Sequence, residues 1–167
     1  LAVFTLFYLT KVRLNNEELL TGDSLVGAVS KKSINSDQIK QVEILDGIIT
    51  QDDLSNEKLE DWFGATEIFN VSESVSIEDS NISKRSFFSI DSVLSVNIQC
   101  NVETIGFSAF KECKSLVSVE IPSLKYLSDQ CFSGCRKLEF VDFPNLKIVG
   151  AYSFYMCINL KKVDFPY

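Results

Sequence analysis

The chain has 167 residues, 46% of them hydrophobic and 23% charged, which is enough for one domain with a sizeable core. Its formal net charge of −7 argues against non-specific binding to nucleic acid or to acidic membranes, and no 18-residue apolar run predicts a membrane-spanning helix. Histidine is absent, which excludes Ser-His-Asp and Cys-His catalysis and HExxH metal sites.

The first residues predict a strand. Leu9, Val12 and Leu14 share the spacing L-x-x-V-x-L, which places Lys11 and Arg13 on the opposite, outward side of an extended segment. The opening LAVFTLFYLT is apolar enough for a signal peptide, but it lacks a basic flank and a small-residue cleavage site, so a structural role is favoured. The chain begins without Met and ends directly after a strand pattern. We therefore expect a fragment, a processed chain, or ends that stack on a partner or on further repeats.

A second strand pattern follows about thirty residues later. Ile39, Val42 and Ile44 repeat the spacing of the first strand. The residues between the two patterns predict a loop in NNEELLTGD and a short helix or strand in SLVGAVSKKS. The sequence thus predicts that the chain opens with a long, irregular repeat.

The segment DLSNEKLEDWFG predicts an α-helix. Asp53 or Ser55 can cap its start and Gly64 its end, and Trp62 is expected in the core. The alternation Val75-Ser76-Ile77 predicts the strand after this helix.

A fixed period organises the rest of the chain. Residues 79–101 form a 23-residue copy, and three 22-residue copies follow at 102–123, 124–145 and 146–167. Such a period is typical of a solenoid, in which small units stack on one another. We therefore interpret residues 1–167 as a single repeat domain, with irregular longer repeats over 1–78 and regular repeats over 79–167. Equivalent positions in the 22-residue copies are Phe110/Phe132/Phe154, Cys113/Cys135/Cys157, Leu116/Leu138/Leu160, Val119/Val141/Val163 and Pro122/Pro144/Pro166.

Each copy predicts one strand and one return segment. In the copy at 102–123, Val119 and Ile121 alternate with polar residues, which indicates a half-buried strand, and Pro122 ends it. One such strand cannot bury its apolar face alone, so the strands are expected to stack in parallel about 4.8 Å apart. The spacing of three in Phe110-x-x-Cys113-x-x-Leu116 suits a 3₁₀ or short helical turn. Crossovers between parallel strands are almost always right-handed, so a right-handed coil is expected.

These residues resemble the BspA-like (Treponema-type) leucine-rich repeats. The family pattern is roughly I-x-x-x-A-F-x-x-C-x-x-L-x-x-V-x-I-P, and the copy at 102–123 matches it from Ile105 to Pro122 at nearly every place. The resemblance implies an α/β leucine-rich-repeat solenoid with a parallel sheet on the concave side and short helical or 3₁₀ turns on the convex side. It also implies a protein-binding module, often secreted or at the cell surface, that carries no catalytic residues of its own.

The cysteines are interpreted as core residues. Cys113, Cys135 and Cys157 occupy one place in the repeat, and Cys131 occupies a place held elsewhere by Ala or Ser. Cys131-x-x-x-Cys135 is half of a zinc pattern, but no second pair completes it, so no metal or other cofactor is expected. Cys100, just after a strand, is predicted to be the most exposed cysteine.

The outward strand positions are the candidate binding site. Carboxylates stack on three neighbouring strands of the predicted sheet, with an aromatic residue beside them. Two interpretations remain: a hydrated face that prevents aggregation, or a stripe that binds a basic segment of a protein partner. The predicted rows are Arg13, Glu43, Ser76, Asn97, Glu120, Asp142, Asp164 and Lys11, Gln41, Ser74, Ser95, Ser118, Phe140, Lys162, and the candidate binding residues are Glu120, Phe140, Asp142, Lys162 and Asp164.

Two functions from different classes fit these observations. One is a non-catalytic protein-binding or adhesion module, which the resemblance favours at a cell surface. The other is an architectural component of an intracellular assembly. Asn70 and Asn81 lie in N-glycosylation sequons, which matter only if the protein is secreted, and the sequence leaves the compartment open.

Overall fold

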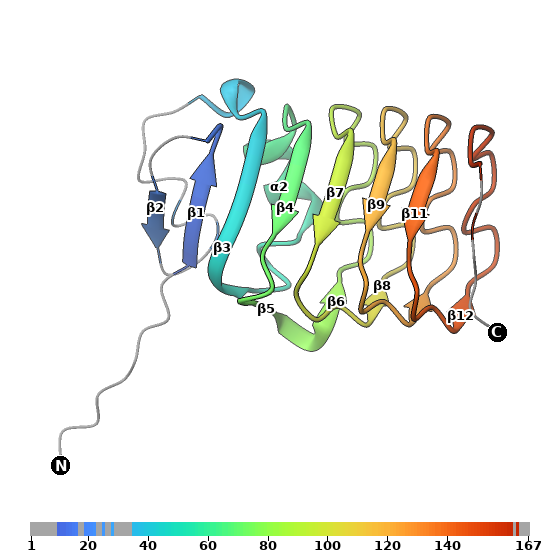
Figure 1. The fold of residues 1–167 in the computed structure, drawn as a ribbon. Helices are drawn as coiled ribbons and strands as arrows, with labels where there is room; N and C mark the ends of the chain where they lie inside the picture. Colours follow the sequence, from blue (N-terminus) through green and yellow to red (C-terminus); the bar gives the residue numbers. More distant parts are fainter. Residues whose placement is uncertain are drawn as a thin grey trace, which may run out of the picture.

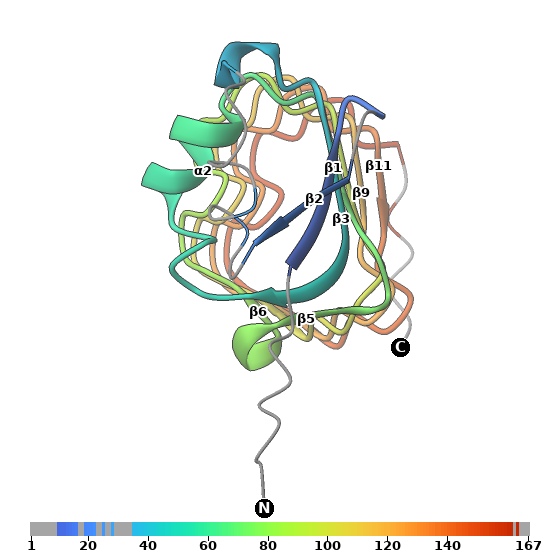
Figure 2. The same ribbon diagram turned by 90° about the vertical axis from the view of Figure 1, so that its left-hand side faces the viewer.

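The computed structural model describes residues 10–16, 19–22, 25, 28, 35–161 and 163. Here the chain winds into successive coils that stack along one axis, so that equivalent strands lie side by side (Figure 1). Seen along that axis, a large sheet forms one side of each coil and turns with helix α2 (Asn56–Phe63) form the other (Figure 2). The hydrophobic core fills the space between these two walls.

The large sheet has eight strands, of which the five from β3 to β11 along its main path pair in parallel. Its order is β11-β9-β7-β4-β3-β1-β2, with β5 paired to the second half of β3. Val119 pairs with Val141 on one side and Val96 on the other, as the repeat predicts. The strands are β1 (Thr10–Leu14), β2 (Leu19–Gly22), β3 (Gln41–Ile49), β4 (Ile68–Val71), β5 (Val75–Ile77), β7 (Ser95–Ile98), β9 (Ser118–Glu120) and β11 (Phe140–Asp142).

A second, smaller parallel sheet lies at the bottom of the coils from β6 onward in Figure 1. Its strands have two residues each, and its order is β12-β10-β8-β6. The inward residues of β6, β8 and β10 are buried, and they coincide with the first isoleucine of the repeat pattern. The strands are β6 (Asn81–Ile82), β8 (Thr104–Ile105), β10 (Tyr126–Leu127) and β12 (Ile148–Val149).

The return segments of the regular coils are successive turns closed by hydrogen bonds between residues three apart, such as that from the Cys113 N–H to the Phe110 carbonyl (3.2 Å), and they do not join into continuous 3₁₀ helices. Each turn wall contains backbone residues with positive φ, such as Ser108 (54°) and Glu112 (61°). These bends let the backbone N–H groups point along the solenoid axis, where Phe110 donates to the carbonyl of Cys131 (2.8 Å) and Glu112 to that of Ser133 (2.8 Å). Coils are therefore hydrogen-bonded to each other on this wall as well as in the sheets. Short 3₁₀ helices occur outside it, as η1 (Ser36–Gln38) and η2 (Glu78–Ser80).

A column of phenylalanine rings runs through the core. The rings of Phe87, Phe110, Phe132 and Phe154 stack nearly parallel, with centroids 4.8, 5.1 and 5.5 Å apart in that order. The column continues by an edge-on contact to Phe69, 5.3 Å from Phe87. The repeat in the sequence therefore appears in the structure as a regular stack of rings, in which the ring of each coil is covered by the ring of the next.

Helix α2 confirms the helix expected after residue 53. Leu59 and Phe63 are buried, whereas Trp62 is half-buried against the core. Ser55 occupies the N-cap position, where its side chain makes no capping hydrogen bond, and Gly64 occupies the C-cap. Within the described residues no helix is long and apolar enough to cross a membrane.

The first strand differs from the prediction. It was expected to be a parallel repeat strand, but β1 pairs antiparallel with both β3 and β2, and β2 lies in a segment predicted to be a loop. Asn15 and Asn16 make the intervening turn with positive φ. Gly47 has φ of 110°, and a Cβ there would lie 2.5 Å from the Cα of Thr10, so only glycine allows β1 this close approach. The hairpin thus covers the N-terminal end of the described solenoid. Residues 1–9 of the apolar opening, for which a structural role was favoured, and most of SLVGAVSKKS lie outside the described residues.

Candidate functional site

Three of the five candidate binding residues lie together on the outward face of the large sheet. Phe140 and Asp142 are in β11, and Glu120 is in β9. Asp142 pairs directly with Glu120, and Phe140 with Ser118. The remaining two candidates, Lys162 and Asp164, lie outside the described residues.

The predicted outward rows were wrong at two strands. Lys11 was placed beside Gln41, but β1 runs antiparallel to β3, so Lys11 pairs with Asp46. Ser76 and Ser74 were assigned to the main face, but the strand between β3 and β7 is β4, and its outward residues are Ile68 and Asn70. Val75–Ile77 instead pairs with Gly47–Ile49, because β3 is long enough for its first half to pair with β4 and its second half with β5. A period of 27 residues, through Val42, Phe69 and Val96, was the signal that sequence reasoning missed.

The corrected main row crosses six strands. It contains five carboxylate or amide residues of the parallel coils and one cation, Arg13, from the hairpin. In order, the row is Arg13, Glu43, Asn70, Asn97, Glu120 and Asp142.

The N-terminal part of this face is electrically neutralised. Arg13 forms an ion pair with Glu43 (3.0 Å), and Lys11 forms one with Asp46 (3.0 Å). The hydrogen bond from Lys11, followed by that from the Gly47 N–H, holds the pKa of Asp46 below its usual value. The hairpin thus supplies the cations that this end of the sheet needs.

The opposite part of the face keeps its negative charge. Within the described residues neither Glu120 nor Asp142 forms an ion pair, although Gln99 donates a hydrogen bond to Glu120 (2.8 Å). Like charges on directly paired strands repel each other by a few tenths of a kcal/mol. The ring of Phe140 stands beside them with 53% of its surface exposed. This arrangement, which we call the acidic–aromatic corner (Glu120, Phe140, Asp142), can attract a cation and offer a ring for it to pack on.

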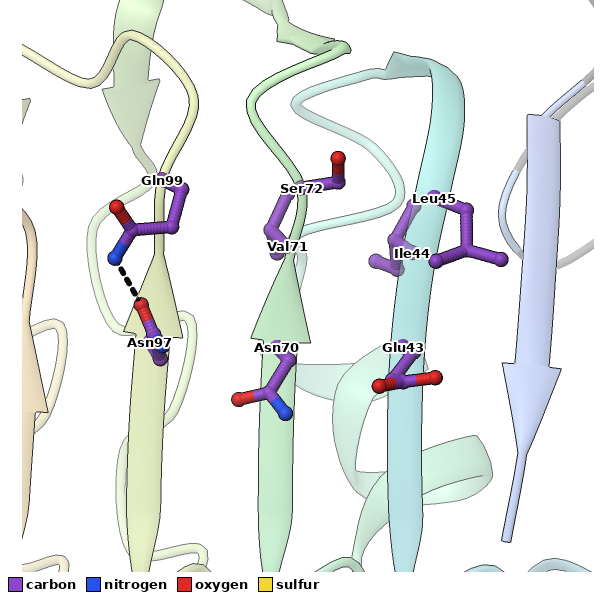
Figure 3. A pocket seen from close by; sticks show the side chains of 8 residues that line it. All are labelled: Glu43, Ile44, Leu45, Asn70, Val71, Ser72, Asn97 and Gln99. Atoms are coloured by element: carbon purple, nitrogen blue, oxygen red, sulfur yellow. Dashed lines mark hydrogen bonds between the residues drawn. The ribbon is translucent and has the colours of Figure 1, made fainter. Parts of the chain in front are cut away.

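A shallow hollow of about 190 Å³ lies between β3, β4 and β7 on the same face (Figure 3). The side chain of Asn70 stands between those of Glu43 and Asn97, with Ser72 and Gln99 above them in this view. Gln99 donates to the side-chain oxygen of Asn97 (2.5 Å). Ile44, Leu45 and Val71 complete the lining. We refer to this feature as the amide hollow.

The cysteines belong to the core and not to a reactive site. The thiols of Cys113 and Cys135 donate to backbone carbonyls of the preceding coil, at 2.8 and 2.9 Å. Cys100 was expected to be exposed but is 2% exposed, and burial raises its pKa to about 11. Cys157 is the most accessible of the five, being half-buried. Burial raises the pKa of both Cys131 and Cys157 to about 12, so these thiols stay protonated and poorly nucleophilic near neutral pH.

Among the residues that the structure describes, no group of three His, Cys, Asp or Glu side chains could hold a metal ion. The acidic residues of the sheet face are spread along a row, and none lies in a deep cleft. The arrangement suits recognition across an open surface.

The stacked coils with two parallel sheets define the leucine-rich-repeat class of solenoid. The family model described as "BspA type Leucine rich repeat region" matches residues 72–167 in six copies, so the chain belongs to this family. The leucine-rich-repeat protein of Bacteroides ovatus is 24% identical with a TM-score of 0.53, over 74% of this chain and 36% of that one. The T. pallidum leucine-rich-repeat protein is 16% identical with a TM-score of 0.45, over 73% of this chain and 62% of that one. A comparison with curated proteins gave no match.

The chain spans about a third of the length of the B. ovatus protein. That similarity supports the fold, and the family generally acts in protein–protein interaction and is typically non-catalytic.

Proposed function

We propose that this chain is a non-catalytic binding module that holds a basic segment of a protein partner against the acidic–aromatic corner. The observation that carries the proposal is that the carboxylates of Glu120 and Asp142 lie on directly paired positions, form no ion pair with any residue that the structure describes, and stand beside the exposed ring of Phe140. A sheet face that served only to stay hydrated would not require two carboxylates at directly paired positions, which repel each other, or an exposed phenylalanine beside them. A cationic partner relieves the repulsion and covers the ring.

The test is affinity capture from native extract, followed by cross-linking mass spectrometry. Asp142→Lys reverses the charge at the corner and is expected to abolish capture of the partner, and Phe140→Ala is expected to weaken it about tenfold or more, as for an interface anchor. The matched control is Glu60→Lys, which makes the same charge change on an exposed residue of α2, on the opposite wall from the sheet (Figure 2). All three variants should melt like the wild type. Capture by Asp142→Lys at the wild-type level would refute the proposal.

A surface-exposed adhesion role is the form of this function that we favour, as an extension of the family's general role in protein binding. Glycan mass on Asn81 in protein purified from its native source would support export. Glycosylation of Asn70 would instead block the amide hollow, so it is expected to be absent from protein that binds its partner.

A second candidate is an architectural role within a larger assembly. It is favoured by the apolar side chains of the coil at 146–161, where Ile148, Tyr152 and Ile158 are 58%, 69% and 67% exposed. Co-purification in a large particle, with cross-links from Lys147 or Lys161 to a constant neighbour, would favour this role over adhesion.

A further inference from the structure

The amide hollow has hydrogen-bonding capacity that the described residues do not use. Within the described part of the chain, the side chain of Asn70 makes no hydrogen bond. The side-chain oxygen of Gln99 is also free there, since its Nε2 makes the bonds to Asn97 and Glu120. Glu43 uses one carboxylate oxygen for Arg13 and leaves the other open. Glu43 and Asn70 thus carry unused acceptor oxygens on neighbouring strands, whereas the amide oxygen of Gln99 is turned away from Asn70 in Figure 3.

The size and lining of the hollow suit one long side chain. Its volume of about 190 Å³ is below the roughly 300–1,000 Å³ of sites that enclose a drug-sized ligand. Leu45, which is half-buried, forms an apolar part of the lining on which a hydrocarbon stem can lie. The charge around the hollow is negative on balance, because Arg13 offsets Glu43, whereas Glu120, next to Asn97 in the row, forms no ion pair within the described residues.

We propose that the amide hollow receives an arginine side chain of the partner. Arginine carries five N–H donors in a flat fork that can reach acceptors on neighbouring strands about 4.8 Å apart, whereas the compact ammonium of lysine cannot span them. The acceptors are the free oxygen of Glu43 and the side-chain oxygen of Asn70, which lie on neighbouring strands. The inference rests on the proposed function, because it treats the hollow and the acidic–aromatic corner as two contacts of one basic segment that crosses the strands.

The experiment titrates the full-length, ¹⁵N-labelled chain with N-acetyl-arginine amide and follows the side-chain NH₂ signals of Asn70, Asn97 and Gln99. N-acetyl-lysine amide and N-acetyl-citrulline amide are the matched probes. The lysine probe has the positive charge but not the planar guanidinium, and the citrulline probe has a similar planar group without the charge. Saturable shifts are expected for arginine, with an affinity at least about fivefold higher than for either other probe.

Variants at the centre of the hollow distinguish recognition from a nonspecific effect. Asn70→Leu should abolish the saturable response, and Asn70→Asp, which adds a carboxylate, should strengthen it about threefold or more, since charged hydrogen bonds are the stronger ones. Asn159→Leu removes an exposed amide elsewhere, whose Nδ2 donates to the carbonyl of Arg136, and should leave the arginine titration unchanged. Equal responses to arginine and lysine, or an unchanged titration of both Asn70 variants, would overturn the inference.

The two proposals fail separately. If arginine does not saturate the hollow while Asp142→Lys still abolishes partner capture, the hollow proposal is wrong and the corner alone binds the partner. If arginine saturates the hollow but Asp142→Lys leaves capture intact, the proposed function is wrong and the hollow is an arginine subsite without the corner.

Discussion

The phenylalanine column offers the sharpest test of how the coils depend on each other. The ring of Phe132 is fully buried and contacts three others, with centroids 5.1 Å from Phe110, 5.5 Å from Phe154 and 6.0 Å from Phe143. Removing a buried phenylalanine costs about 3–5 kcal/mol, and each aromatic pair adds about 0.5–1.5 kcal/mol beyond the buried area. We therefore expect Phe132→Ala to lie in the upper part of that range, at about 4–5 kcal/mol.

Urea unfolding followed by circular dichroism measures this loss. A domain of this kind has a total stability of about 5–15 kcal/mol, so the change removes a third or more of it. The coils from residue 124 onward can also detach before the rest, because each is held by its neighbours, and the dependence of the unfolding free energy on urea should then become shallower.

The matched control is Phe140→Ala, which removes the same ring from an exposed position on the sheet face. It should change the free energy of unfolding by no more than about 0.5 kcal/mol. If Phe132→Ala comes within about 1 kcal/mol of this control, the stacked rings do not hold the coils together and the reasoning fails.

Further predictions concern the hairpin and the thiols. Gly47→Ala forces a Cβ onto Thr10 at positive φ and should cost about 1–3 kcal/mol, with faster amide exchange in β1 than in β9. Stability should fall as pH rises above about 9, because the unfolded chain releases thiol protons there while the folded chain keeps those of Cys131 and Cys157 up to about pH 12. Urea midpoints from pH 8 to 10.5 measure this slope, and Cys131→Ser should flatten it; an equally steep slope in that variant would contradict the assignment. Alkylation of the native protein should modify Cys157 first, and modification of the buried Cys135 at an equal rate would show that the coils open together.

The regular half of the solenoid was predictable because its residues repeat. Val119 and Val141 are paired in one sheet, and Phe110 stacks on Phe132, as the period requires. The helix after residue 53 was predictable for a local reason, since its apolar face and Gly64 are close in sequence. The family resemblance, carried by the same residues, is confirmed by the match over residues 72–167.

The irregular half was predicted less well, because more than one of its segments has the residue pattern of a strand and could occupy the same place in the main sheet. Phe69-x-Val71 and Val75-x-Ile77 both have the alternation of a half-buried strand, and both are strands. Which of them joins the main face depends on β3, which bends near Gly47 and pairs with each in turn. Cys100 was misplaced for a similar reason, because whether a residue after a strand is exposed depends on the coils that cover it.

The candidate site also has one part that the sequence predicted and one part that it did not. The sequence alone brought Glu120, Phe140 and Asp142 together, because a fixed period places equivalent residues on neighbouring strands. It could not find the amide hollow, since Asn70 enters the row only through the pairing of β4 with β3 and β7.

The sequence by itself determined the repeating unit, its core residues and the direction in which the regular strands pair. Only the tertiary structure decided that β1 returns antiparallel to cover one end, so that its cations form ion pairs with Glu43 and Asp46, while Glu120 and Asp142 have no cationic partner among the described residues. The physical reason is the distance over which each feature is determined. A repeat in the sequence fixes contacts between equivalent residues of adjacent coils, whereas the charge balance of a sheet face depends on every strand that joins the sheet.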